Sequence, residues 1–303
     1  MSDKVVVLLS KAREPRPESE RLEQKIVAGL ERWPNLKLMV TPHLYDLSSD
    51  GAGLKAIRST SGDMIVLGWL YPRAAYWVLK ANGIAGRLGR TSCLPEEDVD
   101  EPGRQSGDSE RTVWCFDLRT YERAEQYLAE IGGILAAALV PAAEAVSAVG
   151  NGSFETLDET TRRRWYPVID FSRCTNCLEC LNFCLFGVFG LDEGNAILIE
   201  QPDACRAGCP ACSRICPEGA IMFPQHEDPA IAGDPEASLK GLKLDLSQLF
   251  GAASPAELAA RERERALTEQ QQPQGEPSGH VDSGPENRDD LDRLVDEVDG
   301  LDL

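Results

Sequence analysis

Short apolar segments alternate with segments of helical periodicity over residues 4–140. Apolar runs at 5–9, 36–44, 63–70 and 112–118 predict strands. Helices are predicted at 18–33 and 54–58, from Pro72 to Asn82-Gly83, and from Tyr121 to about Leu139 with Thr120 as the N-cap. This alternation predicts an α/β domain over residues 1–145, built as a small open and largely parallel sheet.

Three segments break the pattern. Residues 94–110 carry seven acids and one arginine, which predicts an acidic surface insertion. Residues 146–164 are rich in glycine and then charged, which is typical of a linker. Residues 227–269 predict a partly helical extension that includes an amphipathic stretch at 239–250 and a charged helix at 255–267.

The C-terminal residues 270–303 predict a disordered acidic tail, because Gln, Pro, Gly and Ser dominate up to residue 287. The tail ends in an amphipathic motif whose apolar residues recur at intervals of three and four: Leu291, Leu294, Val295, Val298 and Leu301. The motif is interpreted as a solubility tail, as a helix that docks back onto its own protein, or as a helix that docks into a groove on a basic partner, and we favour docking to a partner.

The formal net charge of −19 disfavours nucleic acid and anionic membranes as partners. The first residues have no long apolar region of the kind found in signal peptides, and the weakly polar stretch 131–143 is too short to span a bilayer. We therefore expect a cytoplasmic protein. Cysteines in a reducing cytosol more often bind metal or perform redox chemistry than form disulfides.

Eight of the ten cysteines form two tight runs within residues 165–226. The first run is Cys174-x2-Cys177-x2-Cys180-x3-Cys184, and the second is Cys205-x3-Cys209-x2-Cys212-x3-Cys216-Pro217. A 4Fe–4S cubane needs four thiolates, and in a run of this kind the last cysteine ligates the other cluster. We therefore expect one cluster on Cys174, Cys177, Cys180 and Cys216, and a second on Cys205, Cys209, Cys212 and Cys184.

The segment from Tyr166 to Pro224 resembles the bacterial-type dicluster ferredoxins, over about a fifth of the chain. The resemblance implies a βαββαβ module with two 4Fe–4S clusters, in which residues 186–191 and 196–199 form a hairpin. The sequence departs from the family pattern at Leu185, where proline is common, and in the three residues between Cys205 and Cys209. The longer spacing can alter hydrogen bonds to sulfur and hence the reduction potential.

Zinc is the main alternative for these cysteines, but zinc sites usually separate their paired cysteines by roughly 12 to 20 residues and often use histidine. The whole chain has only three histidines. Two cysteines lie outside the module. Cys115 is expected to be a buried core residue, while Cys93 is expected nearer the surface, with a redox or metal role for the pair as the minor alternative.

The loop after the first strand has no glycine, so it lacks the fingerprints that bind dinucleotides or phosphates. Tyr71 and Arg73 follow a strand, where open α/β sheets usually bind ligands, but packing of Tyr71 and an ion pair between Arg73 and a surface acid are the favoured interpretation. A vague likeness to sirohydrochlorin-type chelatases rests on the strand order and on residues 42–47, which contain His43.

Taken together, these features predict a carrier of single electrons between protein redox partners, docked through the α/β domain or the C-terminal motif. One alternative is an iron–sulfur oxidoreductase subunit or enzyme whose α/β domain binds a substrate or chelates a metal. Another is an assembly or regulatory protein whose clusters are purely structural. The sequence contains no recognisable set of catalytic residues, so a carrier is favoured over an enzyme.

Overall fold

In the computed structural model, the described residues are 5–33, 36–94, 111–138, 153–157, 159–235, 237 and 255–271. Most of the predicted acidic insertion, the stretch 239–250 and the C-terminal amphipathic motif lie outside these residues. The chain divides into two compact units, residues 1–266 and 267–303. The sheet, the cysteines and most of the last described helix belong to the first unit.

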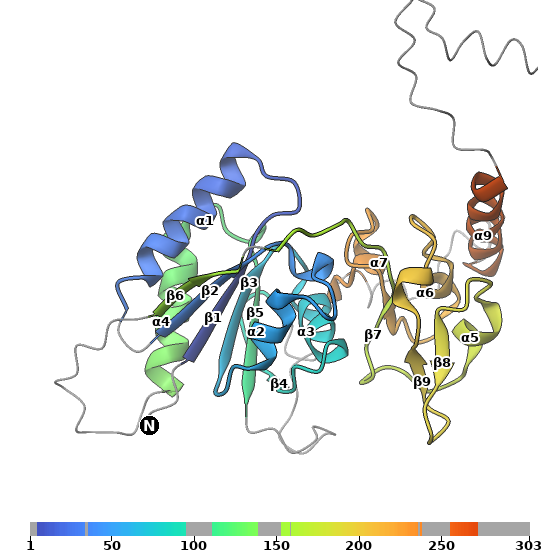
Figure 1. Ribbon diagram of the computed structural model, residues 1–303, viewed down its shortest axis with the longest axis horizontal. Helices are drawn as coiled ribbons and strands as arrows, with labels where there is room; N and C mark the ends of the chain where they lie inside the picture. The colour runs from blue at the N-terminus through green and yellow to red at the C-terminus, as the bar shows by residue number, and fades with distance from the viewer. Residues whose placement is uncertain are drawn as a thin grey trace, which may run out of the picture. The chain divides into compact units, whose positions relative to one another are not determined.

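A six-stranded parallel sheet forms the centre of the N-terminal half (Figure 1). Its strands are β1 (Val5–Ser10), β2 (Leu36–Thr41), β3 (Met64–Gly68), β4 (Arg87–Leu88), β5 (Thr112–Asp117) and β6 (Ser153–Thr156). They follow the order β4-β5-β3-β1-β2-β6. All residues of β1 are buried, as expected for a β-branched run that is covered on both faces. The predicted parallel α/β class is therefore confirmed.

Helices cover both faces of the sheet (Figure 1). The helices α1 (Pro17–Leu30) and α4 (Ala124–Ala138) pack on one face, with Ile26 and Ile131 fully buried. The helices α2 (Ala52–Arg58) and α3 (Pro72–Ala81) pack on the other. All residues of α3 from Pro72 to Leu79 are buried, so this helix has no solvent face along most of its length.

Three local predictions need correction. The fourth helix begins at Ala124, not after Thr120, because the Tyr127 hydroxyl accepts the Tyr121 N–H and holds the preceding residues outside the helix. The second strand ends at Thr41. Beyond it, Leu44 donates its N–H to the Ser10 hydroxyl and opens the 3-10 helix η1 (Leu44–Asp46).

The third correction concerns residues 153–156, which were interpreted as part of a linker. They form β6, which pairs in parallel with β2 in the register Lys37↔Ser153 to Val40↔Thr156. Three of the four residues are exposed, Phe154 among them, which is typical of a short edge strand.

The cysteine-rich segment has the element order β7 (Val168–Ile169), α5 (Glu179–Phe183), β8 (Phe189–Leu191), β9 (Ile197–Ile199), α6 (Ala211–Ile215) and β10 (Ile221–Met222). We call residues 165–226 the cysteine module. β7 pairs antiparallel with β10, and β8 with β9. Tyr166, Val168 and Met222 pack into the same hydrophobic core as α2 and α3, so the module and the sheet domain share buried contacts.

Among the described residues, two further helices follow the cysteine module. Helix α7 (Pro229–Ala232) is capped by the Asp228 carboxylate, which accepts the Ala230 N–H. Helix α9 (Pro255–Gln271) starts where the charged helix was predicted and continues into the glutamine-rich stretch. Within the part of the chain that the structure describes, none of the helices has both the length and the hydropathy needed to cross a membrane.

Candidate metal centre

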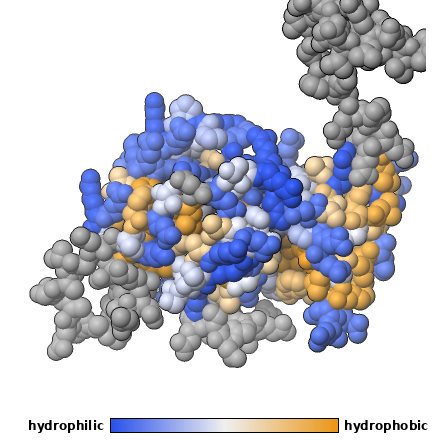
Figure 2. Space-filling view, viewed as in Figure 1, coloured by the Kyte–Doolittle hydropathy of each residue, from blue (hydrophilic) through white to orange (hydrophobic). Residues whose placement is uncertain are grey.

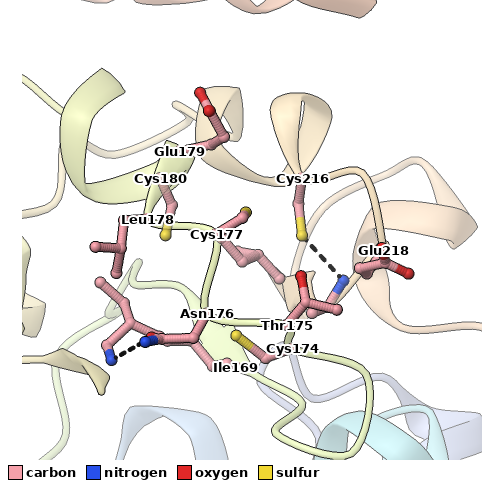
Figure 3. A pocket seen from close by; sticks show the side chains of 13 residues that line it. Ile169, Cys174, Thr175, Asn176, Cys177, Leu178, Glu179, Cys180, Cys216 and Glu218 are labelled. Carbon is pink, nitrogen blue, oxygen red and sulfur yellow. Dashed lines mark hydrogen bonds between the residues drawn. The ribbon is translucent and has the colours of Figure 1, made fainter. Parts of the chain in front are cut away.

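Four cysteines from both runs line one cavity, which we call the first cysteine site. They are Cys174, Cys177, Cys180 and Cys216. In Figure 3 their sulfur atoms surround a common space between the 174–180 loop and the chain that follows α6. Three thiols come from the first run and one from the second, which is the combination that the spacing predicts.

The other four cysteines line a second cavity, which we call the second cysteine site. They are Cys184, Cys205, Cys209 and Cys212. Here the second run supplies three thiols and the first run supplies its last cysteine. Each short helix of the module contains the third cysteine of its run and ends directly before the fourth: α5 contains Cys180 and ends before Cys184, and α6 contains Cys212 and ends before Cys216. The helices therefore carry Cys184 and Cys216 from one site to the other.

The loop of the first cysteine site has an unusual backbone. Asn176 and Leu178 have φ angles of 58° and 63°, in the left-handed region that non-glycine residues rarely adopt. The Asn176 side chain stabilises this loop against the hairpin, because its Oδ1 accepts the Ile197 N–H at 2.8 Å and its Nδ2 donates to the Asn195 carbonyl at 2.9 Å. Within this loop, the Asn176 N–H hydrogen-bonds the Cys174 thiol.

Backbone N–H groups donate to several of the thiols. Ala220 donates to Cys216 Sγ at 3.3 Å, and the N–H groups of Asn176 and Ala211 hydrogen-bond Cys174 and Cys209. N–H donors stabilise negative charge on sulfur, and hydrogen bonds of this kind tune iron–sulfur groups. They are suited to thiolates that carry a metal.

Burial alone would keep the thiols protonated. Desolvation raises the pKa of Cys180 to about 12. It also raises the pKa values of four other thiols, those of Cys174, Cys205, Cys209 and Cys212. Because metal ligation needs thiolates, binding at either site must release protons and supply positive charge to the buried sulfurs.

Among the described residues, no group of three His, Cys, Asp or Glu side chains is placed to hold a single metal ion. One ion gathers its ligands at about 2.3 Å from a single point, whereas a cubane takes one thiolate on each of four irons. The donor set of each cavity, four thiols spread around it with backbone N–H donors, fits the second requirement.

The surroundings of the two sites differ. Glu179 and Glu218 line the first site, where Cys177 is exposed. Arg263 of α9 lines the second site, and Ala259 of α9 is fully buried against Cys209 and Ala211. The Arg263 guanidinium lies 4.1 Å from the centroid of the Phe183 ring. Helix α9 therefore covers the second site but not the first.

Hydrophobic surface gathers over the cysteine module, whereas the sheet domain is mostly polar on the same face (Figure 2). Phe171, Leu185 and Leu191 are the exposed large hydrophobic residues of the module. Leu185 directly follows Cys184 and is 56% exposed. The departure from proline at this position thus adds an apolar side chain to the surface beside a cysteine of the second site.

The remaining candidate residues lie elsewhere. Cys115 is buried in β5, as expected of a core residue, and Cys93 is half buried. Tyr71 packs under the Arg119 guanidinium, 4.1 Å from its ring centroid. Arg73 does not face an open cleft and does not pair with a surface acid: it lies 2.5 Å from the buried Asp170 of the cysteine module.

Sequence reasoning missed the residues that join the two halves. Arg164 donates to the Leu47 carbonyl and to Asp203, which precedes the second run, while its own N–H binds Asp46. Tyr45 and Tyr166 stack at 4.2 Å between ring centroids, and the Tyr166 N–H donates to the Tyr45 hydroxyl. A signal was present for Arg73 alone, as a charged residue at the start of a helix whose next six residues, 74–79, carry no charge.

Three curated proteins of Methanocaldococcus jannaschii are similar to part of the chain. "Uncharacterized ferredoxin MJ0251" is 42% identical over 66 residues, which are 22% of this chain and 44% of the relative. "Uncharacterized ferredoxin MJ0199" is 40% identical over 55 residues, 18% of this chain and 86% of the relative. "Pyruvate synthase subunit PorD" is 34% identical over 67 residues, 22% of this chain and 76% of the relative.

The match thus spans less than half the length of the first relative but most of the other two. No family model matches the chain, and no solved structure matches it significantly. The predicted resemblance is confirmed: through a segment of about a fifth of its length, the chain belongs to the ferredoxin family.

Proposed function

We propose that the chain is an electron-transfer protein that holds two 4Fe–4S clusters. Cys174, Cys177, Cys180 and Cys216 would hold one, and Cys184, Cys205, Cys209 and Cys212 the other. The observation that carries the proposal is the division of the eight thiols between two cavities, each with three cysteines of one run and one of the other. When bound, the clusters supply one-electron transfer.

The protein would contribute ligands, hydrogen bonds and controlled exposure. N–H donors such as Ala220 would stabilise the negative charge on the thiolates. Burial of Cys180 and Cys212 would exclude water from the inner side of each site, while exposure of Cys177 would leave the first site within reach of a partner. The first site is therefore proposed as the point of electron exchange.

The partner is proposed to be a redox protein. One relative is named as a subunit of pyruvate synthase, so its ferredoxin segment belongs to a larger oxidoreductase. The hydrophobic surface on the cysteine module, with Phe171, Leu185 and Leu191 exposed, is suited to a protein contact beside the cysteine sites.

A second candidate function, an enzyme whose sheet domain binds a substrate, is favoured by one observation. A cavity of about 320 Å³ lies where β1 and β2 end, lined by Lys11, Arg13, His43 and Arg163 among others. Ligands of open parallel sheets bind at this edge. Asp46 also lines the cavity and pairs with Arg13, and Glu14 pairs with Arg163, so Lys11 is the side chain that would bind a small organic anion. In this function, electrons from the cysteine module would reduce that anion.

Two measurements distinguish these functions. Anaerobic purification with iron and sulfide analysis tests the clusters, and roughly eight irons and eight sulfides per chain are expected. About four irons, or zinc alone after reconstitution with iron and sulfide, would refute the proposal of two clusters. Oxidation of the reduced protein by a small carboxylate or phosphate compound, lost in Lys11→Gln, would favour the enzyme over the carrier.

A further inference from the structure

Arg73 is a buried charge in a helix that otherwise carries apolar residues into the core. Its side chain is 2% exposed, and that of its partner Asp170 is equally buried. An isolated buried charge is very unfavourable, so a residue of this kind needs partners that satisfy its donors. Arg73 Nε donates to Asp170 Oδ2 at 2.5 Å, and Nη2 donates to the Gly219 carbonyl at 2.9 Å. Both partners lie in the cysteine module.

The Gly219 carbonyl belongs to the same peptide unit as the Ala220 N–H. That N–H donates to Cys216 Sγ at 3.3 Å, and Figure 3 draws this bond. Since a peptide unit is planar, fixing its oxygen also fixes the direction of its N–H. Hydrogen bonds in a chain polarise one another, so a guanidinium on the oxygen strengthens the N–H donor toward sulfur. Gly219 has a φ of 55°, which places this peptide in a left-handed turn.

Asp170 extends the same network to the start of the first run. Its carbonyl accepts the Cys174 N–H at 3.0 Å, and its own N–H donates to the Ala220 carbonyl at 2.8 Å. Its Oδ1 also accepts the Ser172 N–H at 2.9 Å. The Arg73–Asp170 pair therefore contacts the backbone beside Cys174 and beside Cys216, two cysteines of the first site that are far apart in sequence.

We propose that Arg73 is a positioning residue through which the sheet domain raises the reduction potential of the first cysteine site. The proposal rests on the proposed function, because it requires an iron–sulfur group at that site. Reduction adds negative charge to the group. A nearby cation and a stronger N–H donor to Cys216 favour the reduced state, whereas the Asp170 carboxylate, left with Arg173 at 3.7 Å as its cation, disfavours it.

The test is a redox titration of the full-length, anaerobically loaded protein, followed by electron paramagnetic resonance. The variants are Arg73→Gln, Asp170→Asn and the double variant, and Cys177→Ser identifies the signal of the first site. The matched control is Arg119→Gln, because Arg119 also forms an ion pair within the sheet domain, with Asp117, but is 44% exposed.

Arg73→Gln should lower the equilibrium constant for reduction of the first site at least tenfold. For one electron, this is a fall in reduction potential of about 59 mV. Asp170→Asn should raise it, the double variant should lie between the two, and Arg119→Gln should match the wild type. The potential of the second site should stay constant throughout. If Arg73→Gln fails to fold, the shift in potential of Asp170→Asn tests the proposal: a rise supports it and a fall overturns it.

Shifts of the same sign in the two single variants would overturn the proposal, as would an unchanged first site or a shift confined to the second site. A wild-type protein that binds no iron–sulfur group would instead refute the proposed function, since no potential could then be measured. The two failures are therefore distinguishable in one experiment.

Discussion

Each of the two cysteine sites has four thiols, but the residues that surround the thiols differ between the sites. The first site leaves Cys177 exposed, has Glu179 and Glu218 at its edge, and is connected to α3 through the Arg73–Asp170 pair. The second site has Cys209 and Cys212 buried, and α9 covers it with Ala259 and Arg263.

This difference comes from outside the cysteine module. Within the module, each site receives three thiols from one run and one from the other, so the ligands alone would make the sites nearly equivalent. The Arg73–Asp170 pair connects the sheet domain to the first site, and helix α9 covers the second. Elements added to a symmetric module can thus give its two centres different exposure and different electrostatics, and the following predictions test that comparison.

The largest expected effect is the loss of one site at a time. Cys216→Ala should remove iron from the site of Cys174, Cys177 and Cys180, although Cys216 is far from them in sequence. Cys184→Ala should remove it from the other site. Each variant should retain roughly half of the wild-type iron, and each serves as the control for the other. The same electron paramagnetic resonance signal missing from both variants would contradict the division of ligands.

The Arg73–Asp170 pair is expected to contribute to stability as well as to potential. Arg73→Met leaves a buried carboxylate without its main partner, which should lower the free energy of unfolding by about 3 to 5 kcal/mol. The double variant Arg73→Met, Asp170→Asn should recover part of this loss. Denaturant midpoints measure both. As a control, Arg163→Met should change stability by less than about 0.5 kcal/mol, because Arg163 is 68% exposed. Equal losses of stability in Arg73→Met and Arg163→Met would contradict a stabilising role for the buried Arg73–Asp170 pair.

The next prediction concerns His43, at the contact between the sheet domain and Arg164, which also pairs with Asp203 near the second site. His43 lies beside Asp46, whose carboxylate binds the Arg164 backbone, and burial lowers the pKa of His43 to about 4. The unfolded chain therefore binds a proton below pH 6.5 that the folded chain does not bind until about pH 4. This contribution to stability is present above pH 6.5 and is lost as the pH falls toward 4.

Between pH 7 and pH 5, the wild type should lose about 2 kcal/mol more than His43→Gln. Unfolding by denaturant at both pH values gives the comparison, in which the contributions of the carboxylates largely cancel. Parallel losses in the two proteins would show that His43 is not held neutral by burial. Asp46, which raises the pKa, and Arg13, which lowers it, are the charged groups around the ring.

The smallest expected effect concerns α9. Truncation after residue 252 removes Arg263 and the ion pair between Glu262 and Arg214, at 2.7 Å. Such contacts contribute about 1 kcal/mol or less each, so the second site should lose iron to a chelator only a few times faster. The first site should be unaffected. Truncation after residue 271 keeps α9 and should leave both rates of iron loss unchanged. If truncation after residue 252 accelerated iron loss from the first site as well, this would contradict the conclusion that α9 covers the second site alone.

Much of this molecule can be predicted from the sequence where the signal is local. The buried strands follow from runs such as Val5–Ser10, and the two groups of thiols follow from the spacing of the runs. The start of α4 and the end of β2 could not be read in this way. They depend on hydroxyl groups, those of Tyr127 and Ser10, that bind backbone atoms outside their own element.

The contacts between the sheet domain and the cysteine module could not be predicted either, because they join residues that are far apart in the sequence. Arg73 and Asp170 are 97 residues apart, and neither segment alone shows which acid a buried arginine will meet. Residues 153–156 looked like linker because glycines precede them and a charged stretch follows, yet pairing with β2 makes them a strand. Pairing of this kind is a tertiary property, and local propensity does not determine it.

Counting electrons tests whether one chain holds two one-electron centres. The anaerobically loaded protein is titrated with a calibrated low-potential reductant, and the visible absorbance is followed to its end point. Two electrons should be taken up per chain in two resolved steps, since the surroundings of the two sites differ. Uptake of a single electron, or of none by a protein that contains its full iron and sulfide, would contradict the presence of two one-electron centres.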